Sequence, residues 1–303
     1  MKLRGYIDLQ VNGYLGVDFS ASDLTHERCA YACRKLLDCE GVGGFLPTVI
    51  TSHESVYRQN LAILADIIES DEFSGSVLGI HAEGPFISDR PGAVGAHNLG
   101  FVKKPDISFF DQMQDWARGH IKVMTIAAEV AGAQQLCKYA VANGVVVSLG
   151  HQLADASDLK ELAQAGATLM THVGNGMPNM VHRHNNSLVT ALSIKELTAM
   201  IITDGHHLPA HVIEAVINAK GVDKVIITSD ASPIAGMKPG KYDVLGNSAV
   251  LEENGLLHNP EKECLVGSSA NIVQCVEYLR SLGIVSESEI TQMAALNPAK
   301  VLE

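Results

Sequence analysis

Blocks of two kinds alternate along this chain. Short runs of mostly apolar residues, bounded by turn residues, are typical of buried strands, and the amphipathic stretches between them are typical of helices. The expected strands lie at 6–10, 44–50, 77–83, 122–129, 145–151, 168–173, 199–205 and 224–230. Helix-like patterns at 26–40, 55–69, 133–143, 155–166 and 210–221 lie between most of them, and Asp155 supplies a helix-start signal.

This alternation determines the expected fold class. Nearly continuous apolar strands that alternate with helices imply a parallel sheet covered on both faces, and so an α/β fold. Eight regular repeats favour a closed (β/α)8 TIM barrel over an open, doubly wound sheet. No G-x-G-x-x-G motif follows the first expected strand, which weakens a nucleotide-binding interpretation. The sequence therefore predicts a single barrel domain over residues 1–303.

Polar and ionisable side chains occur where the expected strands end. They are Asp8, Gln10, Thr48, Glu83, Glu129, His151, His172, Asp204 and Asp230. In a (β/α)8 barrel these ends converge on one mouth, where active sites are built. A buried, unpaired carboxylate such as Glu83 costs several kcal/mol and should have a partner. The pattern therefore predicts a functional site at this mouth.

Glu83, His151 and His172 form a set of one carboxylate and two imidazoles, which is typical of a catalytic zinc site with positions left open for water. Each residue alone has a simpler explanation, because His151 could cap a helix and His172 could be a hydrogen-bonded core residue. Three such residues at strand ends favour a metal. Asp230 could cap the next segment, but a carboxylate at the mouth could instead take a proton from metal-bound water and give it to a leaving amine.

Composition narrows the possible partners. The 303 residues carry a net charge of −12 and no run of Lys or Arg, which argues against nucleic acid or an anionic membrane but allows a compact basic pocket for a small anion. No apolar stretch approaches the roughly 18 residues of a membrane span, and nothing resembles a signal peptide. The six cysteines include no C-x-x-C pair, so we expect a reduced, cytoplasmic protein.

A series of motifs extends over nearly the whole chain. They are GYIDLQVNG (5–13), GIHAEGPFIS (79–88), GAHN (95–98), SLGH (148–151), THVGNGMP (171–178), TDGHH (203–207), TSDASPIAG (228–236), VGSSANIV (266–273) and NPAK (297–300). In this order they resemble the amidohydrolase superfamily and, within it, the N-acetylglucosamine-6-phosphate deacetylase family. The resemblance implies a hydrolase that removes the acetyl group from an amino-sugar phosphate, releasing acetate and the free amine.

Carried over by position, the resemblance also implies roles for individual residues. Glu83, His151 and His172 would hold the metal, Asp230 would be the acid and base, and His97 would polarise the acetamide carbonyl. The implied substrate-binding residues are Ala96, His97, Asn175, Gly176, Arg183, His207, Leu265 and Val266, with His207 on the phosphate. Arg183 matches an arginine that such enzymes extend across a dimer interface to the phosphate, which implies a homodimer.

The first expected strand bears on the number of metals. Many relatives end this strand in H-x-H and so build a second metal site, whereas this chain has Gln10 and Asn12. Neutral amides are weak ligands for a divalent transition metal. We therefore expect one metal per chain, Zn²⁺ first, with Fe²⁺ or Co²⁺ as alternatives.

The sequence departs from the family pattern in two places. The flanking segments that form a small β-sandwich in relatives are missing, so we expect a bare barrel with at most a β excursion at 237–266, either a surface hairpin or part of a roof. Where relatives read H-R-E-P-G, residues 182–186 read H-R-H-N-N, and Gly174 stands where an aromatic residue is common. N-acetylgalactosamine 6-phosphate, an unphosphorylated acetamide or another amide therefore remain alternative substrates. A non-catalytic sugar-phosphate binder is the alternative from another class.

Overall fold

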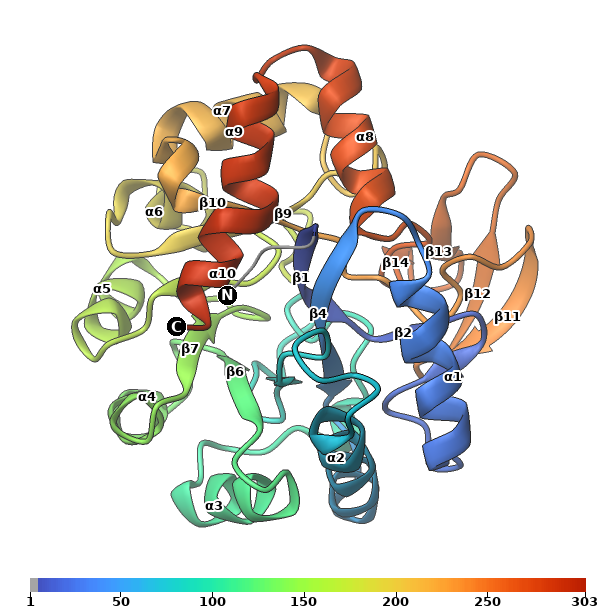
Figure 1. Ribbon diagram of the computed structural model, residues 1–303. Helices are drawn as coiled ribbons and strands as arrows, with labels where there is room; N and C mark the ends of the chain where they lie inside the picture. The colour runs from blue at the N-terminus through green and yellow to red at the C-terminus, as the bar shows by residue number, and fades with distance from the viewer. Residues whose placement is uncertain (1–4) are drawn as a thin grey trace.

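A computed structural model describes residues 5–303 and shows eight parallel strands surrounded by helices (Figure 1). The strands are β1 (Tyr6–Val11), β4 (Val42–Ile50), β5 (Ile80–Glu83), β6 (Ile121–Ile126), β7 (Val146–Leu149), β8 (Leu169–Met170), β9 (Thr198–Ile202) and β10 (Val225–Thr228), and each pairs with the next in this order. The predicted barrel is confirmed. Several strands are shorter than their apolar runs, because these runs continue into the turns at the mouth.

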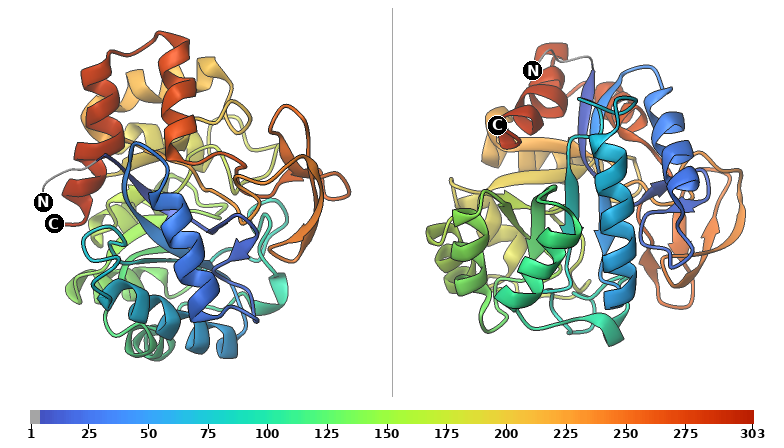
Figure 2. Two further views of the ribbon diagram at one scale, coloured as in Figure 1. Left: turned by 45° about the vertical axis from the view of Figure 1, so that its right-hand side comes forward. Right: turned by 60° about the horizontal axis from the view of Figure 1, so that its bottom comes forward.

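The helices lie outside the strands, as Figure 2 shows from two further sides. They are α1 (His26–Leu37), α2 (Glu54–Glu69), α3 (Ile107–Trp116), α4 (Ala133–Ala142), α5 (Ala156–Gln164), α6 (Ser187–Ser193), α7 (Ala210–Lys220), α8 (Ile272–Leu282), α9 (Glu287–Thr291) and α10 (Asn297–Val301). Asp155 caps α5 as expected, in a reciprocal capping box with Asp158. None of the helices within residues 5–303 has the length and apolar character needed to cross a membrane.

The barrel interior is apolar toward the amino ends of the strands. Its buried cluster is separate from the larger core between sheet and helices and consists of Ile7, Leu9, Leu46, Val123, Leu169, Met200 and Ile226. Val301 and Leu302, at the end of α10, pack against this cluster. Because burying one such side chain stabilises the fold by roughly 1.5–3 kcal/mol, this end serves stability and the opposite end is available for function.

Side chains supplement the backbone where the barrel closes between β1 and β10. Val11 forms a single parallel bridge with Ala231. Three residues earlier in β1, the Asp8 carboxylate accepts hydrogen bonds from the Thr228 hydroxyl (2.7 Å) and from the backbone N–H (3.1 Å) and hydroxyl of Ser229. Burial raises the pKa of Asp8, although these bonds oppose the shift. Asp8, expected at the mouth, instead joins the first and last strands.

A second, antiparallel sheet lies to one side of the barrel (Figure 1). Its strands are β11 (Gly240–Val244), β12 (Asn247–Leu251), β13 (Leu257–Asn259) and β14 (Cys264–Leu265), which occupy the segment where the sequence suggested a β excursion. A short hairpin of β2 (Gly13–Tyr14) and β3 (Val17–Asp18) follows β1. The Asn247 side-chain amide donates to the Ala96 carbonyl oxygen at 3.0 Å. This bond attaches the second sheet to the loop that carries His97.

Candidate active site

A cavity of about 300 Å³ opens at the carboxyl ends of the barrel strands. The predicted site residues that line it are Glu83, Ala96, His97, His151, His172, Asn175, Gly176, His207, Asp230 and Leu265. Val266 is buried in the core of the second sheet, and Arg183 lies exposed outside the cavity. The strand-end pattern and the motifs therefore identified most of the ionisable lining.

Other lining residues were not among the predicted site residues. Among them are Asn179, Leu245, Glu263 and Cys264. Several lie in loops or in the second sheet, where neither periodicity nor motif spacing marks them.

Glu129, in contrast, was expected at the mouth but does not line this cavity. It lies three residues beyond β6, accepts a hydrogen bond from the Leu153 backbone N–H (2.7 Å) and lines a different cavity.

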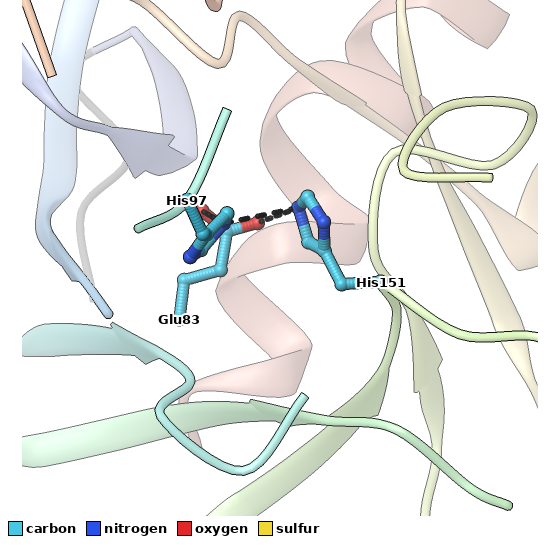
Figure 3. A group of neighbouring side chains, drawn as sticks. All are labelled: Glu83, His97 and His151. Atoms are coloured by element: carbon cyan, nitrogen blue, oxygen red, sulfur yellow. Dashed lines mark hydrogen bonds and ion pairs between the residues drawn. The ribbon is translucent and has the colours of Figure 1, made fainter. Parts of the chain in front are cut away.

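Four ligand-type side chains meet at one point of the cavity. Glu83 Oε1 lies 3.0 Å from His172 Nε2 and 3.3 Å from His151 Nε2, and the two Nε2 atoms are 3.1 Å apart. His97 Nε2 lies 3.2 Å from His151 Nε2 and 3.8 Å from Glu83 Oε2, and Figure 3 shows both rings directed at the Glu83 carboxylate. A tetrahedral cation about 2.1 Å from each ligand needs ligand atoms about 3.4 Å apart, so these separations fit a metal.

Two alternative trios share Glu83 and His151. The candidate ligand atoms of Glu83, His97 and His151 all lie within 4.8 Å of one another, and those of Glu83, His151 and His172 lie closer still. Distance alone does not choose between His97 and His172. The ligand can be identified from the other nitrogen of each ring, Nδ1. The hydrogen bonds of Nδ1 decide whether Nδ1 or Nε2 carries the proton of the neutral ring.

His151 and His97 differ in this respect. His151 Nδ1–H donates to the Ala93 carbonyl oxygen at 2.8 Å, so its Nε2 carries a lone pair for a metal. His97 Nδ1 instead accepts the Thr51 backbone N–H at 3.3 Å and lies 2.9 Å from the Thr51 hydroxyl, which can also donate to it. Two donors at Nδ1 place the proton of the neutral ring on Nε2. Burial and the neighbouring His151 lower the pKa of His97 to about 3 and keep that ring neutral. His97 therefore offers an N–H donor, whereas His172, whose Nδ1 has no partner among the described residues, can offer a lone pair.

The charge of the cluster also suits a cation. Burial raises the pKa of Glu83, but the close approach of the His151 and His172 rings outweighs it and brings this pKa well below its usual range. Burial lowers the pKa of His172, and the hydrogen bond and charge of Glu83 reverse that shift and raise it. One ionised carboxylate with two imidazoles is a donor set that Zn²⁺ and neighbouring divalent metals accept.

His151, His172 and Asp230 share a backbone conformation that is rare outside glycine. Their φ angles are 50°, 27° and 51°, and each residue lies within two residues of the end of its strand. Left-handed backbone at such residues costs about 1–3 kcal/mol, and the fold tolerates it where function requires it. Here the left-handed turn takes the chain out of the strand and directs the side chain into the cavity.

Gly176 lies directly against the two histidine rings. A Cβ at this position would lie 3.0 Å from His172 Cε1 and 3.1 Å from His151 Nδ1, and its φ is +61°. Gly176→Ala is expected to displace the rings and weaken metal affinity by about 10–100-fold, the usual effect of disturbing the support of a ligand. Competition with a chromophoric chelator measures it. The matched control is Gly144→Ala, at φ +76° with no atom within 4 Å of its Cβ, and equal affinities of the two variants would contradict the prediction.

Asp230 lines the same cavity as the histidines. Its Oδ1 accepts hydrogen bonds from the side-chain amides of Gln10 (2.9 Å) and Asn12 (2.8 Å). Burial, reinforced by the charge of Glu83, raises the pKa of Asp230 to about 6. A pKa near neutrality suits a group that takes up a proton and returns it during one reaction.

His207 is oriented by a carboxylate behind it. Its Nδ1–H donates to Asp204 Oδ2 at 2.7 Å, and the Ser268 hydroxyl donates to the same oxygen at 2.7 Å. Burial raises the pKa of Asp204, but its hydrogen bonds, led by that of His207, bring it below the usual range. Asp204, which was expected at the mouth, therefore lies one step behind it and fixes the His207 ring at the cavity wall.

Several proteins of known function match this chain over almost its whole length. No family model matches the sequence. N-acetylglucosamine-6-phosphate deacetylase of Bos taurus is 32% identical over 308 residues, which cover 98% of this chain and 73% of the bovine protein. N-acetylgalactosamine-6-phosphate deacetylase of Escherichia coli O157:H7 is 30% identical over 300 residues, 98% of this chain and 77% of that protein. The crystal structure of N-acetyl-D-glucosamine-6-phosphate deacetylase from Mycobacterium smegmatis superimposes with a TM-score of 0.90 at 25% identity, over 99% of this chain and 78% of that one.

Proposed function

Because the chain belongs to the N-acetylglucosamine-6-phosphate deacetylase family of amidohydrolases, we propose that it hydrolyses N-acetylglucosamine 6-phosphate to glucosamine 6-phosphate and acetate. The observation that carries this proposal is the meeting of a Glu-His-His cluster, an N–H donor and a carboxylate of raised pKa in one cavity. A binding protein has no use for a proton-transfer group in the same cavity as such a cluster.

Glu83, His151 and His172 are the residues that would hold one divalent cation, with Zn²⁺ the first choice and Fe²⁺ or Co²⁺ the alternatives. Such a cation, when bound, lowers the pKa of a water molecule to about 7 and polarises a carbonyl oxygen. Asp230 takes the proton of the attacking water and delivers it to the amide nitrogen as the C–N bond breaks. His97 Nε2–H donates to the acetamide oxygen as negative charge develops there, and one such donor is worth about 2.7–4 kcal/mol.

A bound phosphate is best held by positive charge from Arg or Lys. Within residues 5–303, no Lys or Arg lines it, whereas Glu83, Asp230 and Glu263 do. Arg183 lies in an exposed loop next to Met180, which is 88% exposed, and Val181. Exposed apolar residues beside an arginine support a homodimer in which Arg183 of each chain reaches the neighbouring active site. Together with His207 it would bind the phosphate.

The state of the cysteines bears on the cellular location. All six are free thiols, and most are buried. Persistent free thiols are typical of a reducing compartment. They support the cytoplasmic location that we propose.

The substrate is tested by acetate release from four compounds, N-acetylglucosamine and N-acetylgalactosamine, each with and without a 6-phosphate. We expect the highest kcat/KM for N-acetylglucosamine 6-phosphate. N-acetylgalactosamine 6-phosphate is the second candidate, because an Escherichia coli relative that bears this substrate's name is 30% identical over nearly the whole chain. No acetate from any of the four compounds, by metal-loaded protein, would contradict the proposed function.

Arg183→Ala is expected to raise KM for the phosphorylated sugar by about 10–100-fold, because a hydrogen bond between charged groups contributes roughly 1.5–3 kcal/mol. KM for the unphosphorylated sugar should hardly change. Steady-state kinetics on both substrates measure the difference. A similar rise in both KM values would contradict a phosphate contact.

The proposed crossing between subunits has its own control. Asp230→Asn and Arg183→Ala chains are mixed under conditions that exchange subunits. Each mixed dimer holds one complete site, so a random mixture should reach about one quarter of wild-type activity at low substrate concentration. No recovery above the separate variants would place the function of Arg183 within its own chain.

A further inference from the structure

We propose that the side-chain amides of Gln10 and Asn12 form a clamp that fixes one carboxylate oxygen of Asp230 and leaves the other oxygen to carry the proton. Both would be positioning residues, since they act through Asp230. This inference rests on the proposed function, in which Asp230 is the acid and base.

The contacts divide the two oxygens of Asp230 unequally. Oδ1 accepts N–H groups from Gln10 Nε2 at 2.9 Å and from Asn12 Nδ2 at 2.8 Å. Within residues 5–303, no side chain or backbone group donates to Oδ2, and Asp230 lines the cavity. Rotating the carboxyl group to exchange its oxygens would break two charge-assisted hydrogen bonds, so one oxygen is kept for proton transfer.

The orientation of both amides is maintained at a cost. Gln10 and Asn12 are 0% and 2% exposed, and their carbonyl oxygens, Oε1 and Oδ1, are buried without a partner among the described residues. An unsatisfied buried acceptor costs about 1–3 kcal/mol. Reversing either amide would direct its oxygen at the Asp230 carboxylate and replace attraction by repulsion. The nitrogen of each amide therefore faces Asp230, which also makes these residues poor metal ligands.

The backbone beneath the clamp is held on both sides. The Asn12 backbone N–H donates to the Ala231 carbonyl oxygen (2.7 Å), and the Asn12 carbonyl accepts the Phe19 N–H (3.0 Å). The Val11 N–H donates to the Thr48 hydroxyl (3.0 Å). The clamp and Asp230 therefore lie on adjoining, hydrogen-bonded segments, and a side-chain donor placed here keeps its geometry through the reaction.

Gln10 has a second contact that Asn12 lacks. Its Nε2 also donates to Glu83 Oε1 at 2.9 Å, so one amide group bridges two carboxylates. Two like charges in a buried site repel, and a shared donor offsets part of that repulsion. A neutral amide does this without adding a positive charge that would weaken Asp230 as a base. We therefore expect Asn12 to act through Asp230 alone and Gln10 to act through Asp230 and Glu83.

The test uses Asn12→Leu and Gln10→Met, which keep side-chain size and remove the donor. Loss of a hydrogen bond to a charged group should lower kcat about 10–100-fold. KM should stay within about threefold, because the clamp does not hold the substrate. Metal content should remain at about one ion per chain in Asn12→Leu. Asn12→Asp, which keeps the shape and exchanges the donor for a like charge, should lose at least as much kcat.

A double-mutant cycle separates positioning from a general structural effect. In the Asp230→Asn background, Asn12→Leu should leave the residual kcat unchanged. An undiminished kcat in Asn12→Leu, or an equal fall in both backgrounds, would overturn the clamp while wild-type acetate release still supports the proposed function. Absence of acetate release from the wild type would overturn the function and the clamp together. If Asn12→Leu does not fold, the kcat of Asn12→Asp tests the clamp instead. An unchanged kcat in Asn12→Asp would overturn it.

Discussion

Asp230→Asn is expected to lower kcat by about 10²–10⁴-fold, the contribution usual for a positioned acid and base. Asparagine has the same shape and can still accept hydrogen bonds from Gln10 and Asn12, but it can neither take up the proton of water nor return it to the departing amine. Acetate release with metal-loaded enzyme measures the loss. Metal content and thermal unfolding should match the wild type, because Asp230 is not among the three ligands that we propose.

The same variant gives a pH signature. Asp230 acts as a base only when ionised, and its pKa is raised to about 6 by burial and by the charge of Glu83. Wild-type kcat/KM should therefore rise with pH on the acid side and level off above about pH 6. A bound cation favours the ionised carboxylate, so in the metal-loaded enzyme this rise should occur at lower pH. Asp230→Asn should lose the limb. Normal turnover in the variant, or an unchanged acid limb, would remove Asp230 from the mechanism.

The strands were predictable from the sequence because the signal for them is local. An apolar run with turn residues at each end identifies β4 or β10 without knowledge of the rest of the chain. Even β8, which has only Leu169 and Met170 in regular hydrogen bonding, was located, because its apolar run extends beyond its ladder. The barrel then followed from the number and alternation of the strands.

The site was predictable only where the fold itself brings strand ends together. Glu83, His151 and His172 follow that rule, since each lies at or just beyond the last residue of its strand. Glu129 and Asp8 carried the same sequence signal and have other positions. Glu129 accepts a hydrogen bond from the Leu153 backbone N–H and lines a different cavity. Asp8 lies deeper in β1, where it binds Thr228 and Ser229.

Features that depend on contacts between distant segments were not predictable. The proton position on His97 follows from the Thr51 backbone N–H, which lies 46 residues away. The link between the second sheet and the His97 loop depends on Asn247 and Ala96, 151 residues apart. Neither pair has a spacing or a residue type from which the contact could be predicted. Contacts of this kind decide whether His97 acts as a donor or as a metal ligand.

His172→Ala and His97→Ala are therefore expected to have different consequences, although both rings lie beside His151. Removing His172 takes away one of three proposed ligands and should weaken metal affinity by more than about 100-fold, beyond the usual effect of supporting residues. Removing His97 should leave one metal per chain and lower kcat about 10²–10³-fold, the cost of losing a donor to the developing oxyanion. Metal analysis after dialysis and acetate release under saturating metal separate the two.

The decisive outcome is the metal content of His97→Ala. If this variant loses its metal while His172→Ala retains one ion per chain, His97 is the third ligand, and the proton that the Thr51 N–H assigns to Nε2 must lie elsewhere. The trio of Glu83, His97 and His151 has the distances for this alternative, with ligand atoms within 4.8 Å of one another. Retention by His97→Ala and loss by His172→Ala would instead show that hydrogen bonding at the second ring nitrogen, rather than distance, selects the ligands.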